Sequence, residues 1–194
     1  RETFRFSIGQ IFYFRDREVT LAGSQPEEAR DRESEIVAEA AMDIGGDLSA
    51  RGTIHWEPDE SRAERAAVNL RYRPRFDTVL NLGYSFRRLG TDVKQTDVSL
   101  RWPVTDRWTV VGRWNYSLRE KESLETIWGV EYESCCWGAR LVGRRFLLGT
   151  NEFSEPEYEN GIFAQVHFRG LGGFGQDATS LLRRGISGYA DPFD

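Results

Sequence analysis

The stretch DVSLRWPVTDRWTVVGRWNYSL (97–118) decides the fold, because apolar and polar residues alternate on both sides of a short break. Val98, Leu100 and Trp102 alternate with polar neighbours, residues 103–107 interrupt the pattern, and the alternation resumes at Trp108. A period of two residues is typical of a β-strand with one apolar face. Two such runs joined by a short turn predict an antiparallel hairpin.

The same alternation recurs along almost the whole chain and predicts ten strands. Most of the runs have about ten residues, the length a tilted strand needs to cross a bilayer, whereas strands of soluble proteins average about five or six. Strand length therefore favours a membrane barrel over a soluble sandwich. The runs lie at 4–14, 36–43, 48–57, 68–73 (ending at Pro74), 80–87, 97–102, 108–118, 124–133, 137–146 and 161–169.

The connections between the predicted strands differ at the two ends of the sheet. Short links at 44–47, 74–77, 103–107 and 134–136 alternate with longer, charged links at 15–34, 58–63, 88–95, 119–123 and 147–160. This asymmetry is typical of an outer-membrane barrel, and the charge run at 24–35 is expected to be a solvated extracellular loop. Aromatic residues near strand ends would form the interfacial girdles of such a barrel: Trp56, Tyr72, Trp102, Trp108, Tyr132 and Trp137.

The composition narrows the class of protein. A net charge of -5 argues against a nucleic-acid partner, which would require a basic patch. No apolar run approaches the roughly 18 residues of a membrane helix. The negative mean hydropathy does not exclude a membrane barrel, because only every second residue of a barrel strand faces lipid. The chain begins at Arg1 inside what already has the pattern of a strand, so we expect a piece of a longer protein.

Arginines and carboxylates occupy the polar face of the predicted strands. An arginine facing lipid near the bilayer midplane would cost about 2–4 kcal/mol, so this face must contact water or protein. Two interpretations stay open: a hydrated lumen with cross-strand charge pairs, or a path along which arginines accept phosphate-bearing head groups. The basic residues expected to face the lumen include Arg51, Arg71, Arg101, Arg113 and Arg140.

The sequence offers little for catalysis. Its two histidines, His55 and His167, lie near no nucleophile motif, and no metal-ligand spacing is present. The GLGGFG stretch (170–175) lacks the spacing and the βαβ context of a dinucleotide site. We therefore predict a non-enzymatic protein that uses no metal or cofactor. The glycines after residue 169 break the alternation, and residues 177–184 are expected to form a short helix that ends at Gly185.

Cys135 and Cys136 are the only two cysteines of the chain, and they lie side by side on a predicted turn. Adjacent cysteines rarely bond to each other, because disulfide geometry needs a separation and direction that neighbours seldom supply. Either both thiols are free, or each pairs with a cysteine outside this sequence.

Two stretches, 99–147 and 160–189, resemble the C-terminal barrel of the LPS-assembly family LptD. The YESCCW core at 132–137 carries the resemblance, together with the order NGIF, GLG, LL and GY from residue 160 onward. The resemblance implies an all-β fold, with about ten C-terminal strands of an antiparallel transmembrane barrel of about 26 strands in a Gram-negative outer membrane. Residues 1–169 would belong to the barrel and residues 170–194 to a C-terminal periplasmic tail. The implied function is transport and insertion of lipopolysaccharide into the outer leaflet; a porin or receptor-type barrel is the alternative.

The resemblance also implies partners and residue roles. Cys135 and Cys136 would bond to cysteines of a preceding N-terminal part, in keeping with an oxidising periplasm. The implied partners are an LptE lipoprotein plug, the periplasmic Lpt bridge acting through an N-terminal jellyroll domain, lipopolysaccharide, outer-membrane lipid and the barrel-assembly machinery. The run at 161–169 would be the last strand and would meet the first at a lateral seam through Gly161, Ile162, Phe163, Ala164, Gln165, Val166, His167 and Phe168.

Overall fold

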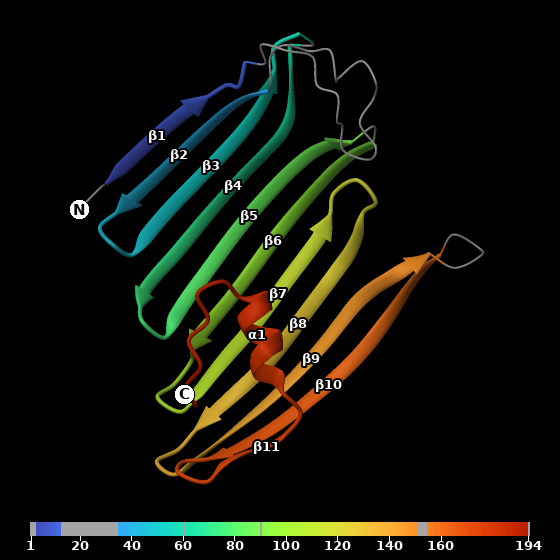
Figure 1. The fold of residues 1–194 in the computed structure, drawn as a ribbon. Helices are drawn as coiled ribbons and strands as arrows, with labels where there is room; N and C mark the ends of the chain where they lie inside the picture. The colour runs from blue at the N-terminus through green and yellow to red at the C-terminus, as the bar shows by residue number, and fades with distance from the viewer. Residues whose placement is uncertain (1–2, 13–34, 60, 90, 151–154, 194) are drawn as a thin grey trace.

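The computed structural model describes residues 3–12, 35–59, 61–89, 91–150 and 155–193. These residues form one antiparallel sheet of eleven strands, which follow one another in the order of the sequence, and one helix (Figure 1). Within these ranges, no helix is both long and apolar enough to span a membrane.

All ten predicted strands are present, and an eleventh follows them. The bounds are β1 (Phe4–Gly9), β2 (Ile36–Ile44), β3 (Leu48–Glu57), β4 (Arg62–Arg75), β5 (Thr78–Leu89), β6 (Thr91–Pro103), β7 (Trp108–Ser117), β8 (Glu122–Glu133), β9 (Trp137–Thr150), β10 (Pro156–Phe168) and β11 (Gly172–Gly175), followed by α1 (Ala178–Gly185). The short turns at 45–47, 76–77, 104–107 and 134–136 lie together at one end of the sheet, here called the short-turn end (Figure 1).

Several predicted strand limits in the middle of the chain are wrong; β4 and β6, for example, begin at Arg62 and Thr91 and not at residues 68 and 97. β4 does not stop before Pro74 but continues to Arg75, and its pairing with β5 shifts register between Tyr72 and Arg75. Proline has no backbone N–H to donate to a neighbouring strand, so a strand tolerates it where the regular pairing is interrupted. The expected loop at 88–95 is instead a hairpin, because Arg88 pairs with Asp92.

The first predicted run is also shorter than expected. β1 ends at Gly9, although the alternation continues to residue 14. Residues 13 and 14 lie outside the described residues, as does the predicted extracellular loop up to residue 34.

β11 overturns the expectation that the run at 161–169 is the last strand. Gly172–Gly175 pairs antiparallel with residues 165–168 of β10. Gly172 and Gly175 have φ angles of 100° and 113°, which side-chain-bearing residues rarely adopt. A Cβ on Gly175 would also collide with the carbonyl oxygen of Ala164. The same glycines that break the alternation therefore allow the chain to turn back and add a strand.

The two faces of the sheet are packed in an unusual way. The small apolar core lies on the face that carries the charged residues, here called the polar face, where four strand residues pack against α1 and the segment after it. Small apolar residues at polar-face positions make this contact possible. The core consists of Val79, Val111, Ile127, Val142, Ala178, Leu181, Leu182 and Ile186.

The opposite face, here called the apolar face, leaves its large side chains exposed. Phe6 is 58% exposed and Leu82 is 41% exposed, so neither belongs to a water-soluble core. Soluble monomers rarely expose contiguous apolar surface on this scale, so this face is suited to contact with an apolar environment. Other exposed members are Phe4, Ile8, Met42, Ile54, Val68, Trp102, Trp114, Trp128, Leu141 and Ile162.

Aromatic side chains gather on the apolar face near the short-turn end. The ring centroids of Trp108 and Tyr132 are 4.9 Å apart, and those of Tyr132 and Trp137 are 5.1 Å apart. Tyr72 and Trp102 lie near the same end, whereas Trp56 lies near the other end of β3. Five of the six predicted girdle residues therefore lie at one end of the sheet.

Candidate functional site

The most buried polar groups of the described residues lie where the C-terminal tail (residues 177–193) crosses the polar face. The tail begins with α1, which forms as predicted: Asp177 is its N-cap and accepts a hydrogen bond from the backbone N–H of Ser180 at 3.2 Å. Leu181 and Leu182 lie on the buried side of the helix, so the tail is held to the sheet by apolar contact as well as by polar groups.

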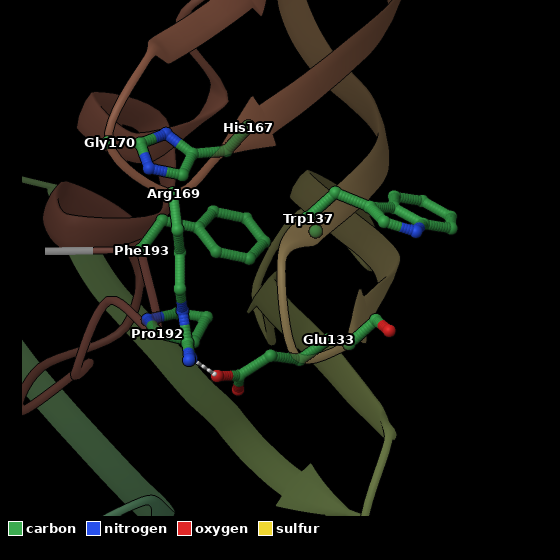
Figure 2. A pocket seen from close by; sticks show the side chains of 9 residues that line it. Glu133, Trp137, His167, Arg169, Gly170, Pro192 and Phe193 are labelled. Atoms are coloured by element: carbon green, nitrogen blue, oxygen red, sulfur yellow. Dashed lines mark hydrogen bonds and ion pairs between the residues drawn. The ribbon is translucent and has the colours of Figure 1, made fainter.

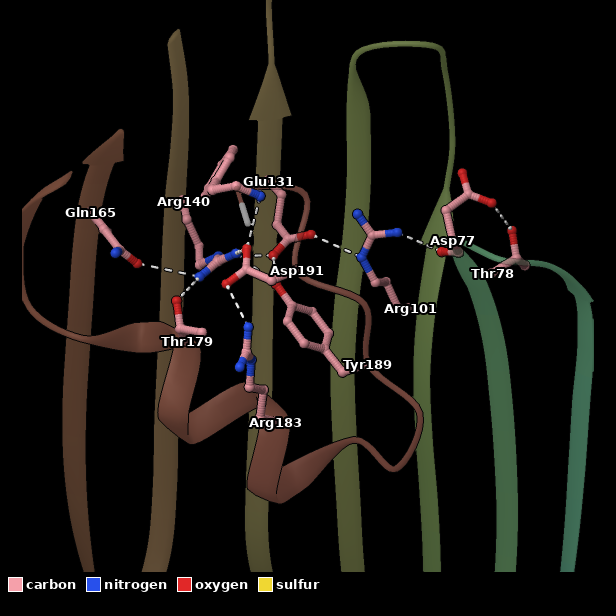
Figure 3. A network of polar contacts seen from close by, with 11 residues as sticks. Asp77, Thr78, Arg101, Glu131, Arg140, Gln165, Thr179, Arg183, Tyr189 and Asp191 are labelled. Atoms are coloured by element: carbon pink, nitrogen blue, oxygen red, sulfur yellow. Dashed lines mark hydrogen bonds and ion pairs between the residues drawn. The ribbon is translucent and has the colours of Figure 1, made fainter. Parts of the chain in front are cut away.

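Arg140 on β9 is the centre of this network, and its side chain is fully buried. Its guanidinium donates to Glu131 on β8 and to Asp191 in the tail, both at 2.8 Å. It also donates to Thr179 at 2.7 Å and to Gln165 on β10 at 3.2 Å (Figure 3). A buried charge is tolerated when it is paired and its donors are satisfied, and here both the sheet and the tail supply the acceptors.

Glu131 links a second arginine and a tyrosine to this centre. Arg101 on β6 donates to Glu131 at 3.2 Å and to the carbonyl oxygen of Asp77 at 2.5 Å. The Tyr189 hydroxyl donates to Glu131 and accepts a hydrogen bond from Arg140 at 2.6 Å (Figure 3). The polar contacts therefore run without a break from the turn before β5 to β10.

The tail contributes its polar groups in defined protonation states. Burial, followed by the nearby Glu131 carboxylate, raises the pKa of Tyr189 far above its ordinary value, so the hydroxyl remains a donor. Burial alone would raise the pKa of Asp191, but the backbone N–H of Phe193 and the guanidinium of Arg140 together lower it. At neutral pH Asp191 is thus an ionised partner for Arg140.

A second layer of charge crosses the polar face farther from the short-turn end. Arg113 on β7 lies 2.7 Å from Asp97 on β6 and 2.6 Å from Glu125 on β8. Glu125 also pairs with Arg144 on β9 at 2.6 Å. Opposite charges therefore alternate over four strands, and the predicted cross-strand charge pairs are present here.

The five arginines predicted to face the lumen all lie on the polar face. Three of them contact the tail. Arg140 does so as described, and the guanidinium carbon of Arg101 lies 5.7 Å from the centroid of the Tyr189 ring. Arg71 donates to the Ser187 hydroxyl at 2.5 Å. Arg113 pairs only within the sheet, and Arg51 lines a shallow hollow over β1–β3 together with Glu39. The tail residues of the network were not predicted, because nothing in their spacing marks them; Val111 and Ile127 at polar-face positions were the available signal that something packs there.

The cysteine pair lies on the turn between β8 and β9, outside the network. Cys135 and Cys136 are both exposed and form no disulfide with each other; their Sγ atoms lie 2.7 Å apart. The hydrogen bond between the two thiols lowers the pKa of Cys135 and raises that of Cys136. Arg169, which pairs with Glu133 at 2.6 Å, donates to the carbonyl oxygen of Cys135 at 3.3 Å.

A pocket of about 280 Å³ adjoins this turn and is closed on one side by the end of the tail (Figure 2). His167 lines it, and its ring stacks on Phe193 with centroids 5.5 Å apart and planes within 6°. The other histidine, His55, pairs with Glu35 at 2.9 Å. Among the described residues, no three side chains of His, Cys, Asp or Glu are grouped as metal ligands would be.

The predicted seam strand, β10, is divided between the two faces of the sheet. Ile162, Ala164, Val166 and Phe168 are exposed on the apolar face, whereas Gly161, Phe163, Gln165 and His167 are half-buried on the polar face. Beyond the four positions that pair with β11, the edge of β10 at residues 156–164 has no neighbouring strand in the described part of the chain.

The family model and the curated relatives that match this chain all belong to one family. The family model "LptD: LPS transport system D" matches residues 1–108. The "LPS-assembly protein LptD" of Nitrosococcus oceani is 40% identical over 99% of the chain, that of Alkalilimnicola ehrlichii 39% identical over 97%, and that of Xylella fastidiosa 36% identical over 97%. The chain spans about a quarter of the length of these relatives, with 25%, 25% and 24% covered.

Proposed function

The chain belongs to the LptD family, and on this premise we propose that it forms the C-terminal part of an outer-membrane β-barrel that inserts lipopolysaccharide into the outer leaflet. The observation that carries the proposal is the division of the sheet into an exposed apolar face and a charged polar face. The family relationship favours this function over a porin or a receptor.

The two sheet edges support the view that more strands complete the barrel. The outer edges of β1 and of residues 156–164 of β10 have no paired neighbour strand among the described residues. Unpaired backbone groups are not viable in the hydrocarbon region, so a membrane-embedded sheet of this kind must be closed by further strands. We propose that the remaining part of the same protein supplies them.

The seam of the barrel would lie at β10. Of the predicted seam residues, 161–164 would face the first strand, and release of lipid would need this contact to be weak. The support is that β11 occupies the edge at residues 165–168, so that only the part of β10 farther from the short-turn end remains for pairing with another strand. Fewer ladder hydrogen bonds make a weaker seam.

The polar face would hold the plug and the lipid path. The tail covers the polar face from β5 to β9 and contacts Arg71 on β4, while the polar face of β1–β3 carries Arg51 and an open hollow. We propose that an LptE-type lipoprotein occupies this uncovered area and that phosphate-bearing head groups pass arginines of the polar face. The periplasmic Lpt bridge, acting through an N-terminal jellyroll domain, would deliver the lipid from the short-turn end, and the barrel-assembly machinery would insert the barrel.

The cysteine pair would fix the missing part of the protein to the barrel. Both thiols are exposed at the short-turn end, which would face the periplasm. The family resemblance implies that their partners would be two cysteines of the N-terminal part; the sequence itself has no third cysteine. Non-reducing electrophoresis of the full-length protein tests this pairing: the mobility shift should disappear in the double variant Cys135→Ser, Cys136→Ser.

Site-specific photo-crosslinking in cells tests the transport path. A photoreactive phenylalanine at Arg51, on the polar face of β3, should capture lipopolysaccharide only while the lipid is being delivered. The same group at Ile54, on the apolar face of the same strand, should capture membrane lipid whether or not delivery continues. Equal capture at both positions after delivery is blocked would contradict a lipid path along the polar face, as would no capture at Arg51.

A further inference from the structure

Cationic side chains border the apolar face at the end opposite the short turns. On β5, Arg88 follows Leu82, Tyr84 and Phe86 at alternate positions and therefore shares their face. On β6, Lys94 lies directly opposite Phe86. The guanidinium carbon of Arg88 and the ammonium nitrogen of Lys94 each lie 5.6 Å from the centroid of the Phe86 ring. Both cations thus rest on an aromatic ring at the side of the sheet that faces lipid.

A third cation joins them from the next hairpin. Arg119, between β7 and β8, donates to the carbonyl oxygen of Asp92 at 3.0 Å. The Asp92 carboxylate accepts a hydrogen bond from Arg88 at 3.2 Å and lies 3.8 Å from the Lys94 ammonium. The Asp92 carboxylate therefore contacts two cations and its backbone carbonyl oxygen a third. The three cations with Asp92, here called the cationic rim, keep an excess of positive charge. The side chains of Arg88 and Lys94 are 34% and 44% exposed, so the charged ends are accessible.

The rim lies at the depth where lipid head groups begin. Lys94 is eight residues along β6 from the girdle residue Trp102. Eight residues span roughly 26 Å along a strand, or about 20 Å across the membrane at a tilt of about 40°, which approaches the apolar band of about 25 Å. The cations thus come directly after the last apolar residues that face lipid. Long cationic side chains in such positions lie along the apolar surface and place their charged ends in the polar head-group region.

A separate hairpin repeats the arrangement. Arg145 on β9 is eight residues from the girdle residue Trp137, and it is exposed. Its guanidinium carbon lies 4.0 Å from the centroid of the Tyr158 ring on β10. The hydroxyl of Tyr158 donates to Glu122 at 2.7 Å, so a carboxylate lies near this cation as well. A cation above an aromatic ring therefore recurs at the same level on two hairpins.

We propose that Arg88, Lys94 and Arg119 bind the phosphate groups of lipid in the outer leaflet, on the outside of the barrel and away from the transport path. Phosphate accepts several charge-assisted hydrogen bonds at once, and three converging cations with a single carboxylate are suited to it. The proposal rests on the proposed function in one respect: the end opposite the short turns must face the outer leaflet.

Lipid retention by the full-length protein tests the cationic rim. The protein is placed in nanodiscs that contain either diphosphorylated lipid A or a neutral glycolipid, and bound lipid is counted by native mass spectrometry. The triple variant Arg88→Gln, Lys94→Gln, Arg119→Gln should retain about tenfold less lipid A, the change expected for one lost charge-assisted hydrogen bond, and as much glycolipid as the wild type. Asp92→Asn should retain more lipid A, because it removes the competing carboxylate.

Arg87→Gln is the matched control, because it removes the same charge from the neighbouring position, which faces the polar side of β5. Its lipid A retention should equal that of the wild type. Equal retention by the triple variant, an equal loss in Arg87→Gln, or a decrease in Asp92→Asn would each overturn the proposal.

Surface lipopolysaccharide is measured in the same strains. Unchanged export in the triple variant, with lipid A retention lost, separates the rim from the transport path. Failure of the Arg51 crosslink with normal retention at the rim would count against the transport function alone.

Discussion

Arg140 on β9 and Asp191 in the tail form a 2.8 Å ion pair across 51 residues of sequence. The side chain of Arg140 is fully buried and that of Asp191 is 4% exposed, so water does not replace either partner. The pair therefore makes the position of the tail on the polar face dependent on single residues.

Replacing Arg140 with Ala should release the tail and destabilise the protein. The change leaves Glu131 and Asp191 buried without their main partner, which typically costs about 3–5 kcal/mol. We expect faster proteolysis within residues 177–193 of the full-length protein and a lower melting temperature in detergent. Arg51→Ala is the control, because Arg51 lies on the same face but is exposed; equal effects of the two changes would contradict a specific role for Arg140.

Acid should loosen the tail only below the ordinary range of aspartate titration. The pKa of Asp191 in the folded protein is lower than its ordinary value of 3.8, so its contribution to stability is complete above that value and is lost as the pH falls through the folded pKa. Proteolysis of the tail by an acid-active protease should therefore rise only at a pH below about 3.8. Asp191→Asn should be cleaved faster at neutral pH, and its cleavage should depend less on pH.

Tyr189→Phe tests the neutral part of the same network. The change removes the hydroxyl that donates to Glu131 and accepts from Arg140, and it leaves the ring in place. Loss of a buried hydrogen bond to a charged group costs about 1.5–3 kcal/mol, less than the loss of the arginine. The melting temperature should fall between those of the wild type and Arg140→Ala; a value at or below that of Arg140→Ala would place the centre of the network at Tyr189.

The sheet could be predicted from the sequence because each strand carries its own signal. β3 has the predicted limits, Leu48–Glu57, since a glycine turn and a polar loop mark its ends. Boundaries failed where pairing overrides local sequence. Pro74 stays within β4 because a register shift accommodates it. Arg88 and Leu89 continue β5 because they pair directly with β6.

The site was only half predictable for a related reason. The polar face could be assigned from alternation, and with it Arg101 and Arg140. Apart from Thr179, the tail partners of Arg140 lie in GISGYADPFD (185–194), which has no periodicity, and they are up to 51 residues away from it. Local patterns do not encode such long-range pairing. The apolar residues at polar-face positions, such as Val142, indicated that the face was covered, although not by which segment.

The two cysteines should differ in reactivity when the full-length protein is reduced. The thiolate is the reactive form, and the pKa of Cys135 is lowered by the hydrogen bond from Cys136, whose own pKa is raised. Iodoacetamide should therefore modify Cys135 first, and the preference should be greatest at a pH below the ordinary thiol pKa of 9.0. Peptide mass spectrometry after brief labelling measures the ratio. Preferential labelling of Cys136 would contradict the assignment.

Gly175→Ala should detach β11 from β10. At Gly175 the φ angle is 113°, and a Cβ would meet the carbonyl oxygen of Ala164, so both strain and a collision oppose the change. Strained backbone of this kind costs about 1–3 kcal/mol, which a strand of four residues cannot absorb. Gly173→Ala is the matched control, because its nearest side-chain contact, at 3.4 Å, is ordinary.

Val166 and Phe174 lie directly opposite each other, so a disulfide between cysteines placed there reports the pairing. It should form in the otherwise unchanged protein and with Gly173→Ala, but not with Gly175→Ala, because only a docked β11 brings the two positions within bonding distance.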